Sequence, residues 1–189
     1  MRVIPDNVVL LFFKTFPGHE GRPNKRGGSQ PRDAMGMPEP RTVKLEVLPA
    51  GKDELFYLDR FMTEFDAGRN ESVELTDLVP FRRIVSRDLF TNHLTGDMKI
   101  NVNGRAQYVT YIAETIKRPD EIWIDQGGHS DRTMYCLSRF VLKKETMHII
   151  TAFKEGGNSE LWVGWSGFQS FVPSYYQSKR RGDRIYVRP

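Results

Sequence analysis

The clearest periodic pattern in the chain is a set of apolar residues at helical spacing in its second half. Positions i, i+3, i+4 and i+7 share one face of a helix, and here they are Val109, Ile112, Ala113 and Ile116. Lys117 and Arg118 would lie in the last turn, where cations suit the helix dipole, and Pro119 prevents continuation. The pattern therefore predicts a helix over residues 105–118.

Two earlier segments also have apolar residues at helical spacing. In residues 53–65 they are Leu55, Leu58, Phe61, Met62 and Phe65. Asp53 and Glu54 favour a helix N-terminus there, and Gly68 favours its end. In residues 81–90 the apolar positions predict another helix through Phe81, Ile84, Val85 and Leu89.

Strand patterns dominate the remaining sequence. Residues 42–48 alternate apolar and polar side chains, as in a strand with one solvated face, and residues 122–124 form a short apolar strand. A hairpin is predicted through Lys143-Lys144-Glu145, between strands at residues 133–142 and 147–153. Strands at residues 161–168 and 184–187 follow. Helices ahead of a three- or four-stranded antiparallel sheet predict an α+β fold.

The composition divides the chain into three parts. Residues 1–40 form an N-terminal segment that ends in a Gly-, Pro- and Arg-rich linker over residues 17–40. Within it, the apolar run at residues 8–13 predicts a short strand, because it is too short to cross a membrane and lacks the pattern of a secretory signal. Residues 41–80 predict a strand–helix layer, and residues 81–189 a main domain.

Composition also limits the chemistry. The single cysteine, Cys136, excludes an intramolecular disulfide and a cysteine-based zinc cluster, and four dispersed histidines argue against a metal site or cofactor. The net charge of +4 is uneven, with an excess of acidic residues over 52–78 and of basic residues over 175–189. A basic surface suits a polyanion such as nucleic acid, and a solvated basic tail is the alternative.

A set of residues in the second half of the chain resembles a known family. The residues are Leu89, Phe90, Lys99, Gly104, Arg105, Tyr108 and the R-P-D-E-I-W run from Arg118 to Trp123, followed by the C-terminal run Arg180, Gly182, Asp183, Arg184, Ile185 and Tyr186. They resemble phage-associated nucleases of the Barnase/EndoU/Colicin/RelE-like fold, particularly the C-terminal domain of proteins similar to phage Mu head protein F. The resemblance covers residues 85–189. The linker is similar to connectors that precede effector domains in phage and toxin polypeptides.

The resemblance implies a metal-independent ribonuclease. In such an enzyme the 2′-hydroxyl of RNA attacks the adjacent phosphate, which requires a base, an acid and cations to stabilise the transition state. His93 fits the acid–base role by its near-neutral pKa, although it also fits a surface residue in a turn. Lys99 and Arg105 match family positions and would bind the phosphate, and Thr151 would hold a phosphate oxygen.

The C-terminal segment supplies the remaining predicted site residues. Tyr176 would donate a proton, Tyr175 would stack on a base, and Lys179 and Arg181 would contact phosphate. Each of these side chains also fits a purely structural role.

Partners and location follow from the same resemblance. The expected partners are RNA, with tRNA as one candidate, and an immunity or antitoxin protein or phage head proteins, without a membrane. The expected location is a bacterial cytoplasm, with delivery as an effector or within a virion. An inactive phage head or RNA-binding module is the alternative. A toxin of another class, such as an ADP-ribosyltransferase, ranks third because no Glu-x-Glu strand end is found.

Overall fold

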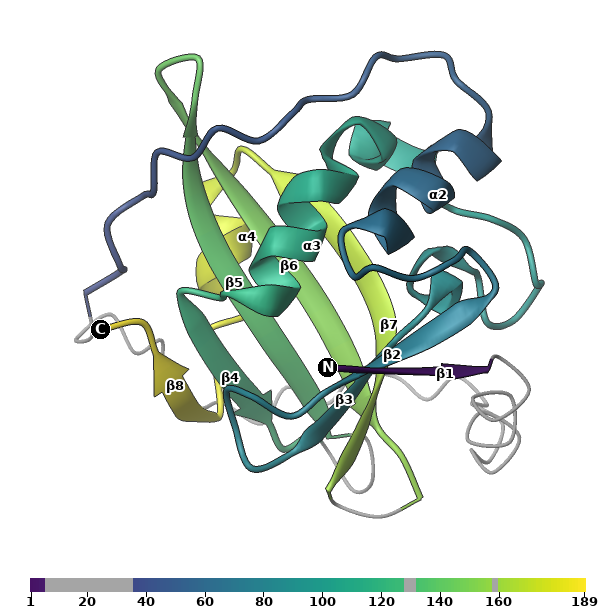
Figure 1. Ribbon diagram of the computed structural model, residues 1–189. Helices are drawn as coiled ribbons and strands as arrows, with labels where there is room; N and C mark the ends of the chain where they lie inside the picture. The colour runs from purple at the N-terminus through teal and green to yellow at the C-terminus, as the bar shows by residue number, and fades with distance from the viewer. Residues whose placement is uncertain (6–35, 128–131, 158–159) are drawn as a thin grey trace.

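The strands of the protein form one mixed sheet. The computed structural model describes residues 1–5, 36–127, 132–157 and 160–189 (Figure 1). Within them the sheet has eight strands in the order β1-β2-β3-β7-β6-β5-β4-β8, and every neighbouring pair is antiparallel except β3 and β7. The strands are β1 (Arg2–Pro5), β2 (Glu71–Leu75), β3 (Arg82–Val85), β4 (Glu121–Asp125), β5 (Thr133–Leu142), β6 (Glu145–Glu155), β7 (Leu161–Ser170) and β8 (Asp183–Val187).

The predicted α+β class is confirmed, but the predicted sheet of three or four antiparallel strands is too small. Strands β4 to β7 form the expected antiparallel centre. The sheet grows on both sides of this centre, because β3 adds to β7 in parallel and β8 adds to β4. The parallel pair joins segments far apart in the chain, and no short-range pattern predicts it.

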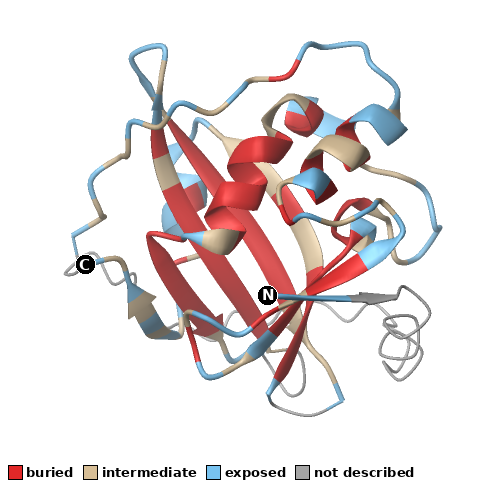
Figure 2. Cartoon of the chain, viewed as in Figure 1, coloured by how far each residue is buried: buried red, intermediate tan, exposed pale blue. Residues whose placement is uncertain are grey.

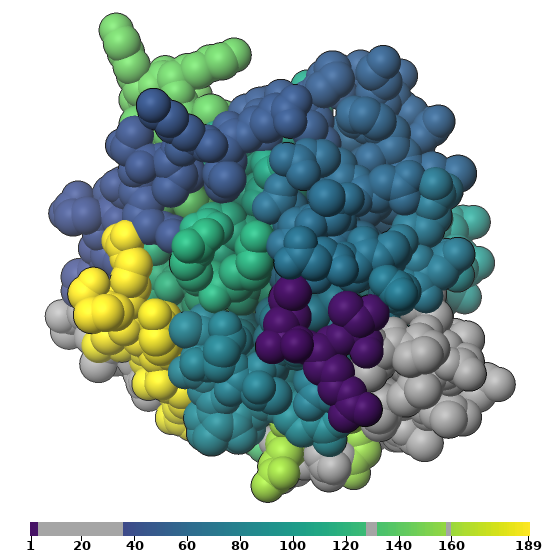
Figure 3. Space-filling model, viewed as in Figure 1, coloured from purple at the N-terminus to yellow at the C-terminus, as the bar shows by residue number. Residues whose placement is uncertain are grey.

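Helices cover both faces of the sheet. Helices α2 (Glu54–Thr63) and α3 (Val109–Lys117) lie on the front face, while the short helix α4 (Pro173–Gln177) lies behind it (Figure 1). The front core is continuous from α2 through α3 to the sheet, and Figure 2 shows α3 and the central strands as buried. Residues 36–80 cover much of this face in Figure 3, so little of the front of the sheet is open to a ligand.

The two predicted helices at residues 53–65 and 105–118 are present, the second in a shortened form. The side chain of Asp53 accepts a hydrogen bond from the backbone N–H of Phe56 at 2.7 Å and caps α2. Helix α3 begins only at Val109, because Asn103 and Gly104 have positive φ values of 56° and 69°. A 3-10 helix, η2 (Val102–Tyr108), leads into it.

The predicted helix at residues 81–90 is wrong. Residues 82–85 are strand β3, and a 3-10 helix, η1 (Arg87–Phe90), follows. The adjacent β-branched residues Ile84 and Val85 are both buried, since β3 lies between β2 and β7. A strand buried on both faces loses the alternation that marks an exposed one, and its apolar residues then imitate a helical pattern.

Residues 42–48 do not form the predicted strand. They lie across the helices in an extended form, and their apolar residues Val43, Leu45 and Val47 pack on the front core as the alternation predicts. Side chains of α3 supply hydrogen bonds that a neighbouring strand would otherwise supply to this segment. Thr110 Oγ1 donates to the carbonyl of Glu46 at 2.7 Å, and Tyr111 Oη donates to the carbonyl of Leu45 at 3.1 Å.

The other predicted strands are present. The predicted hairpin joins β5 to β6, and Lys143 and Lys144 both have positive φ, at 49° and 73°, as a two-residue hairpin turn requires. The strand predicted at residues 8–13 lies outside the described residues. Among the residues that the structure describes, no helix is both long and apolar enough to cross a membrane.

The R-P-D-E-I-W run connects the sheet to distant parts of the chain through buried ion pairs. Asp120 and Glu121 are fully buried. Asp120 pairs with Arg41 at 2.9 Å, and Glu121 pairs with Arg180 at 2.8 Å and Arg184 at 3.4 Å. A buried carboxylate is stable only when it is paired in this way. The run therefore holds residue 41 and the C-terminal segment against β4.

Candidate active site

The second half of strand β7 borders no other strand of the described residues on one side. Strand β3 pairs with β7 only from Leu161 to Val163, while β6 pairs with β7 along most of its length. Among the described residues, side chains rather than a strand therefore contact the outer edge of β7 from Trp165 onward. Backbone carbonyls at such an edge need partners, and here basic side chains supply them.

Three predicted site residues meet at this edge. Lys99 Nζ donates to the carbonyl of Trp165 at 3.0 Å, and His93 Nε2 lies 3.4 Å from the same oxygen. Arg105 donates to the next outward carbonyl, that of Gly167, at 3.3 Å. We call His93, Lys99 and Arg105 the edge cluster.

Two local features bring the edge cluster together. His93 lies in the turn after η1, and its ring stacks on the indole of Trp165 with centroids 3.8 Å apart and planes 19° apart. The positive φ values at Asn103 and Gly104 turn the chain back toward β7 just before Arg105. Arg105 also donates to the carbonyl of Val102 at 3.1 Å, which holds its guanidinium in place.

Burial changes the protonation of the edge cluster. Burial, followed by the charge of Lys99, lowers the pKa of His93 to about 4. Burial, followed by the charge of Arg105, lowers the pKa of Lys99 to about 8. At pH 7 His93 is therefore neutral and can accept a proton, while Lys99 is mainly charged.

Lys99 and Arg105 differ from two other buried cations, Arg83 and Arg180, because they lack carboxylate partners among the described residues. The buried side chains of Arg83 and Arg180 pair with Asp77 and Glu121. Arg105 is only 8% exposed, yet within the described ranges neither it nor Lys99 has a carboxylate within ion-pair distance. Two close cations that contact only carbonyls favour an anionic ligand.

The hydroxyls of Thr151 and Tyr176 bond to groups other than the edge cluster. Thr151 is fully buried on the front face of β6, where its hydroxyl donates to the carbonyl of Cys136 at 3.2 Å. Tyr176 is fully buried behind the sheet, and its hydroxyl donates to Glu121 at 3.4 Å. Burial and the nearby Glu121 raise the pKa of Tyr176 well above its usual range. Both side chains have structural partners in this arrangement.

The C-terminal predicted residues lie in and after α4. Tyr175 is 44% exposed, and Lys179 Nζ lies 5.0 Å from the centre of its ring. Arg181 pairs with Asp125 at 2.6 Å. Tyr175 is close enough to influence Arg105, since its phenol opposes the lowering of the Arg105 pKa by burial.

Sequence reasoning missed Trp165 as part of the site. It lies among small residues in the run Gly164-Trp165-Ser166-Gly167, which marks a strand that other groups approach closely. A Cβ on Gly167 would come within 2.8 Å of Ile112 and 3.0 Å of Leu89.

Among the described residues, no three His, Cys, Asp or Glu side chains lie together as a set of metal ligands would.

The edge cluster, α4 and β8 all lie within the match to a family model. The model, described as phage-Barnase-EndoU-ColicinE5/D-RelE like nuclease2 (PBECR2), matches residues 60–187. The chain belongs to this family. PBECR2 membership confirms the predicted family and the general class of nuclease. No curated protein and no solved structure matches the chain.

Proposed function

We propose that this PBECR2 nuclease is an endoribonuclease that cleaves RNA without a metal ion, with the edge cluster as its phosphate site. The observation that carries the proposal is the pair Lys99 and Arg105, two close cations that have carbonyl partners but no carboxylate in the described residues. A phosphate would supply the negative charge that balances these two cations. Their hydrogen bonds to a charged phosphate oxygen would also be stronger than those to a neutral carbonyl. Lys99 Nζ has three donors and uses one on Trp165.

The proposed reaction is a transfer of the phosphoryl group within RNA. The 2′-oxygen forms a bond to phosphorus while the bond from phosphorus to the 5′-oxygen breaks. Neutral His93 accepts the proton of the 2′-hydroxyl, and charged Lys99 protonates the leaving 5′-oxygen. Arg105 binds the non-bridging oxygens as charge develops on them. The products are a 2′,3′-cyclic phosphate and a free 5′-hydroxyl.

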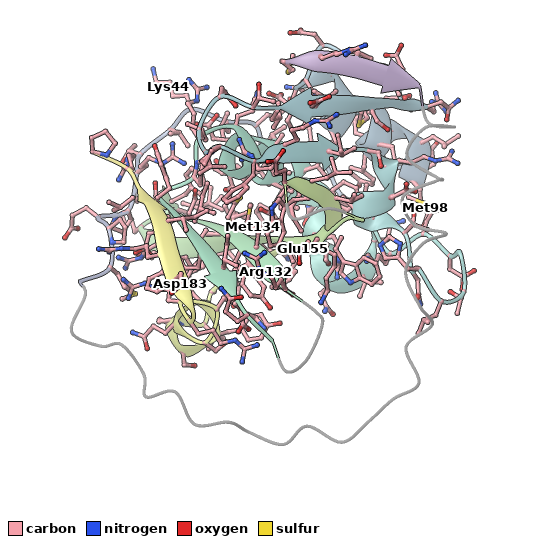
Figure 4. The ribbon with its side chains drawn as sticks, turned by 90° about the horizontal axis from the view of Figure 1, so that it is seen from below. Lys44, Met98, Arg132, Met134, Glu155 and Asp183 are labelled. Carbon is pink, nitrogen blue, oxygen red and sulfur yellow. The ribbon has the colours of Figure 1, made fainter. Side chains whose placement is uncertain are left out.

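The test uses RNA and DNA of the same sequence in excess EDTA, with wild-type protein and the variants Lys99→Ala and Arg105→Ala. We expect cleavage of RNA only, with a cyclic phosphate end, and a loss of about a hundredfold or more in each variant. Lys44→Ala is the matched control, because Lys44 is exposed and lies far from Met98, the neighbour of Lys99 (Figure 4). Equal cleavage of DNA, or activity that EDTA abolishes, would refute the proposal.

An RNA-binding module without activity is the second candidate. The low pKa of His93, about 4, favours it, because so weak a base removes a 2′-hydroxyl proton inefficiently. Intact RNA that is bound in a salt-sensitive way, with binding lost in Arg105→Ala, would support this candidate over the ribonuclease.

We further propose that the protein acts in a bacterial cytoplasm, either as a delivered effector or from a virion, and that a neutralising protein controls it. A ribonuclease active in the cell that makes it degrades that cell's own RNA. Pull-down from the producing cell with the inactive Arg105→Ala variant tests the existence of such an inhibitor, since the variant can be made safely.

A further inference from the structure

Exposed aromatic rings and cations follow one another around helix α4. Phe171 and Tyr175 are 43% and 44% exposed, whereas aromatic side chains in the core, such as Phe61, are fully buried. Lys179 and Arg181 follow within six residues of Tyr175. We call these four residues, Phe171, Tyr175, Lys179 and Arg181, the α4 strip.

The cations of the α4 strip are close to one another. Burial, followed by the charge of Arg181, lowers the pKa of Lys179. Lys179 Nζ lies 5.0 Å from the ring of Tyr175 and 5.5 Å from that of Tyr135, and it has no carboxylate within ion-pair distance in the part of the chain described. Of the carboxylates that the structure describes, only Asp125, the partner of Arg181, offsets this charge. The strip therefore suits an anion.

The α4 strip adjoins the edge cluster. Phe171 lies edge-on to Tyr108 of η2, with ring centroids 6.4 Å apart, and η2 also carries Arg105. Tyr175 lies close enough to Arg105 to influence its pKa, and Lys179 Nζ lies 5.0 Å from the centre of the Tyr175 ring. Both exposed rings of the α4 strip therefore lie near the segment that carries the proposed phosphate site.

We propose that the α4 strip binds unpaired nucleotides next to the scissile phosphate, so that the substrate is single-stranded RNA or an unpaired loop. This inference rests on the proposed function. Two exposed rings beside two cations match a single strand, which offers free base faces and phosphates together. Bases in a duplex are stacked on one another and have no free face for Tyr175. Charge favours this occupant over an apolar protein surface.

Binding of a non-cleavable strand tests the strip without requiring activity. The probe is a fluorescent six-nucleotide strand with 2′-deoxy sugars, measured by anisotropy. We expect Tyr175→Ala and Lys179→Ala each to raise its Kd about tenfold, as the loss of one stacking or phosphate contact does, and Lys44→Ala to leave it unchanged. An unlabelled duplex should compete poorly. Equal binding by the wild type and both variants, or equal competition by the duplex, overturns the inference.

Cleavage separates this inference from the proposed function. In each variant the ratio of kcat/KM for a six-nucleotide RNA to that for a dinucleotide should fall about tenfold. An unchanged ratio with active enzyme overturns the α4 strip and leaves the ribonuclease intact. If no RNA is cut but the variants still lose binding of the deoxy strand, the ribonuclease fails and the strip stands. Tyr175 is exposed, and thermal unfolding of each variant checks that it folds.

Discussion

At the scale of single residues, burial lowers the pKa of two histidines that lie in different surroundings. Burial lowers the pKa of both His93 and His148 to about 4, with help from Lys99 and Arg139 respectively. His93 contacts a carbonyl at the edge of the sheet, whereas His148 is buried behind it, beside the ring of Tyr176 at 5.0 Å. Among the described atoms, neither ring nitrogen of His148 has a hydrogen-bond partner.

The edge cluster predicts a bell-shaped dependence of kcat/KM on pH. Activity should rise as pH increases through about 4, where His93 loses its proton, and fall through about 8, where Lys99 loses its charge. Lys99→Arg tests the alkaline limb, because arginine keeps its charge throughout. The limb near pH 8 should disappear in whatever activity this variant retains. A limb that persists there would assign it to another group.

His148 predicts a loss of stability in acid. Its pKa is about 4 in the folded protein and about 6.5 in the unfolded chain, so the unfolded chain binds more protons between these values. The free energy of unfolding should therefore fall by roughly 3 kcal/mol as pH decreases from about 6.5 to about 4. In His148→Gln this part of the fall should vanish. Urea unfolding at the two pH values, with an equal fall in both proteins, would contradict the prediction.

At the scale of elements, strand β7 joins the core to the site. One edge of its second half faces β6, and the carbonyls of the other edge accept hydrogen bonds from Lys99 and Arg105. Gly167 lets Leu89 of η1 and Ile112 of α3 approach the strand closely. The packing of α3 and the position of the edge cluster therefore depend on the same residue.

We expect a substitution of Gly167 to lower both the stability and the activity of the protein. A Cβ there would lie 2.8 Å from Ile112 and 3.0 Å from Leu89, closer than side chains tolerate. Gly167→Ala should lower the free energy of unfolding by about 1–3 kcal/mol, the usual cost of overpacking a core. Gly157→Ala is the control, since no atom lies within 4 Å of its added Cβ. Equal unfolding midpoints for the two variants would contradict the prediction, because they would show that the core accommodates the added Cβ without a loss of stability.

At the scale of the whole molecule, the sequence predicted local structure better than long-range pairing. Helix α2 and strands β5 to β7 follow from periodicity, and His93, Lys99 and Arg105 do meet in space. Strand β3 was mistaken for a helix because it is buried between β2 and β7, and β7 is distant in the chain. The role of Thr151 at the phosphate was predicted from the family resemblance, and its burial and its bond to the carbonyl of Cys136 are properties of the whole fold that the sequence pattern does not give.

The buried ion pairs of Glu121 have a consequence during synthesis of the protein. Glu121 is fully buried and depends on Arg180 and Arg184, which the ribosome adds about sixty residues later. Without them the carboxylate would be a buried, uncompensated charge, which costs several kcal/mol. Strand β4 therefore cannot reach its final position on a nascent chain before Arg180 and Arg184 have been made. A nuclease built in this way stays incomplete, and so inactive, until this late segment has left the ribosome.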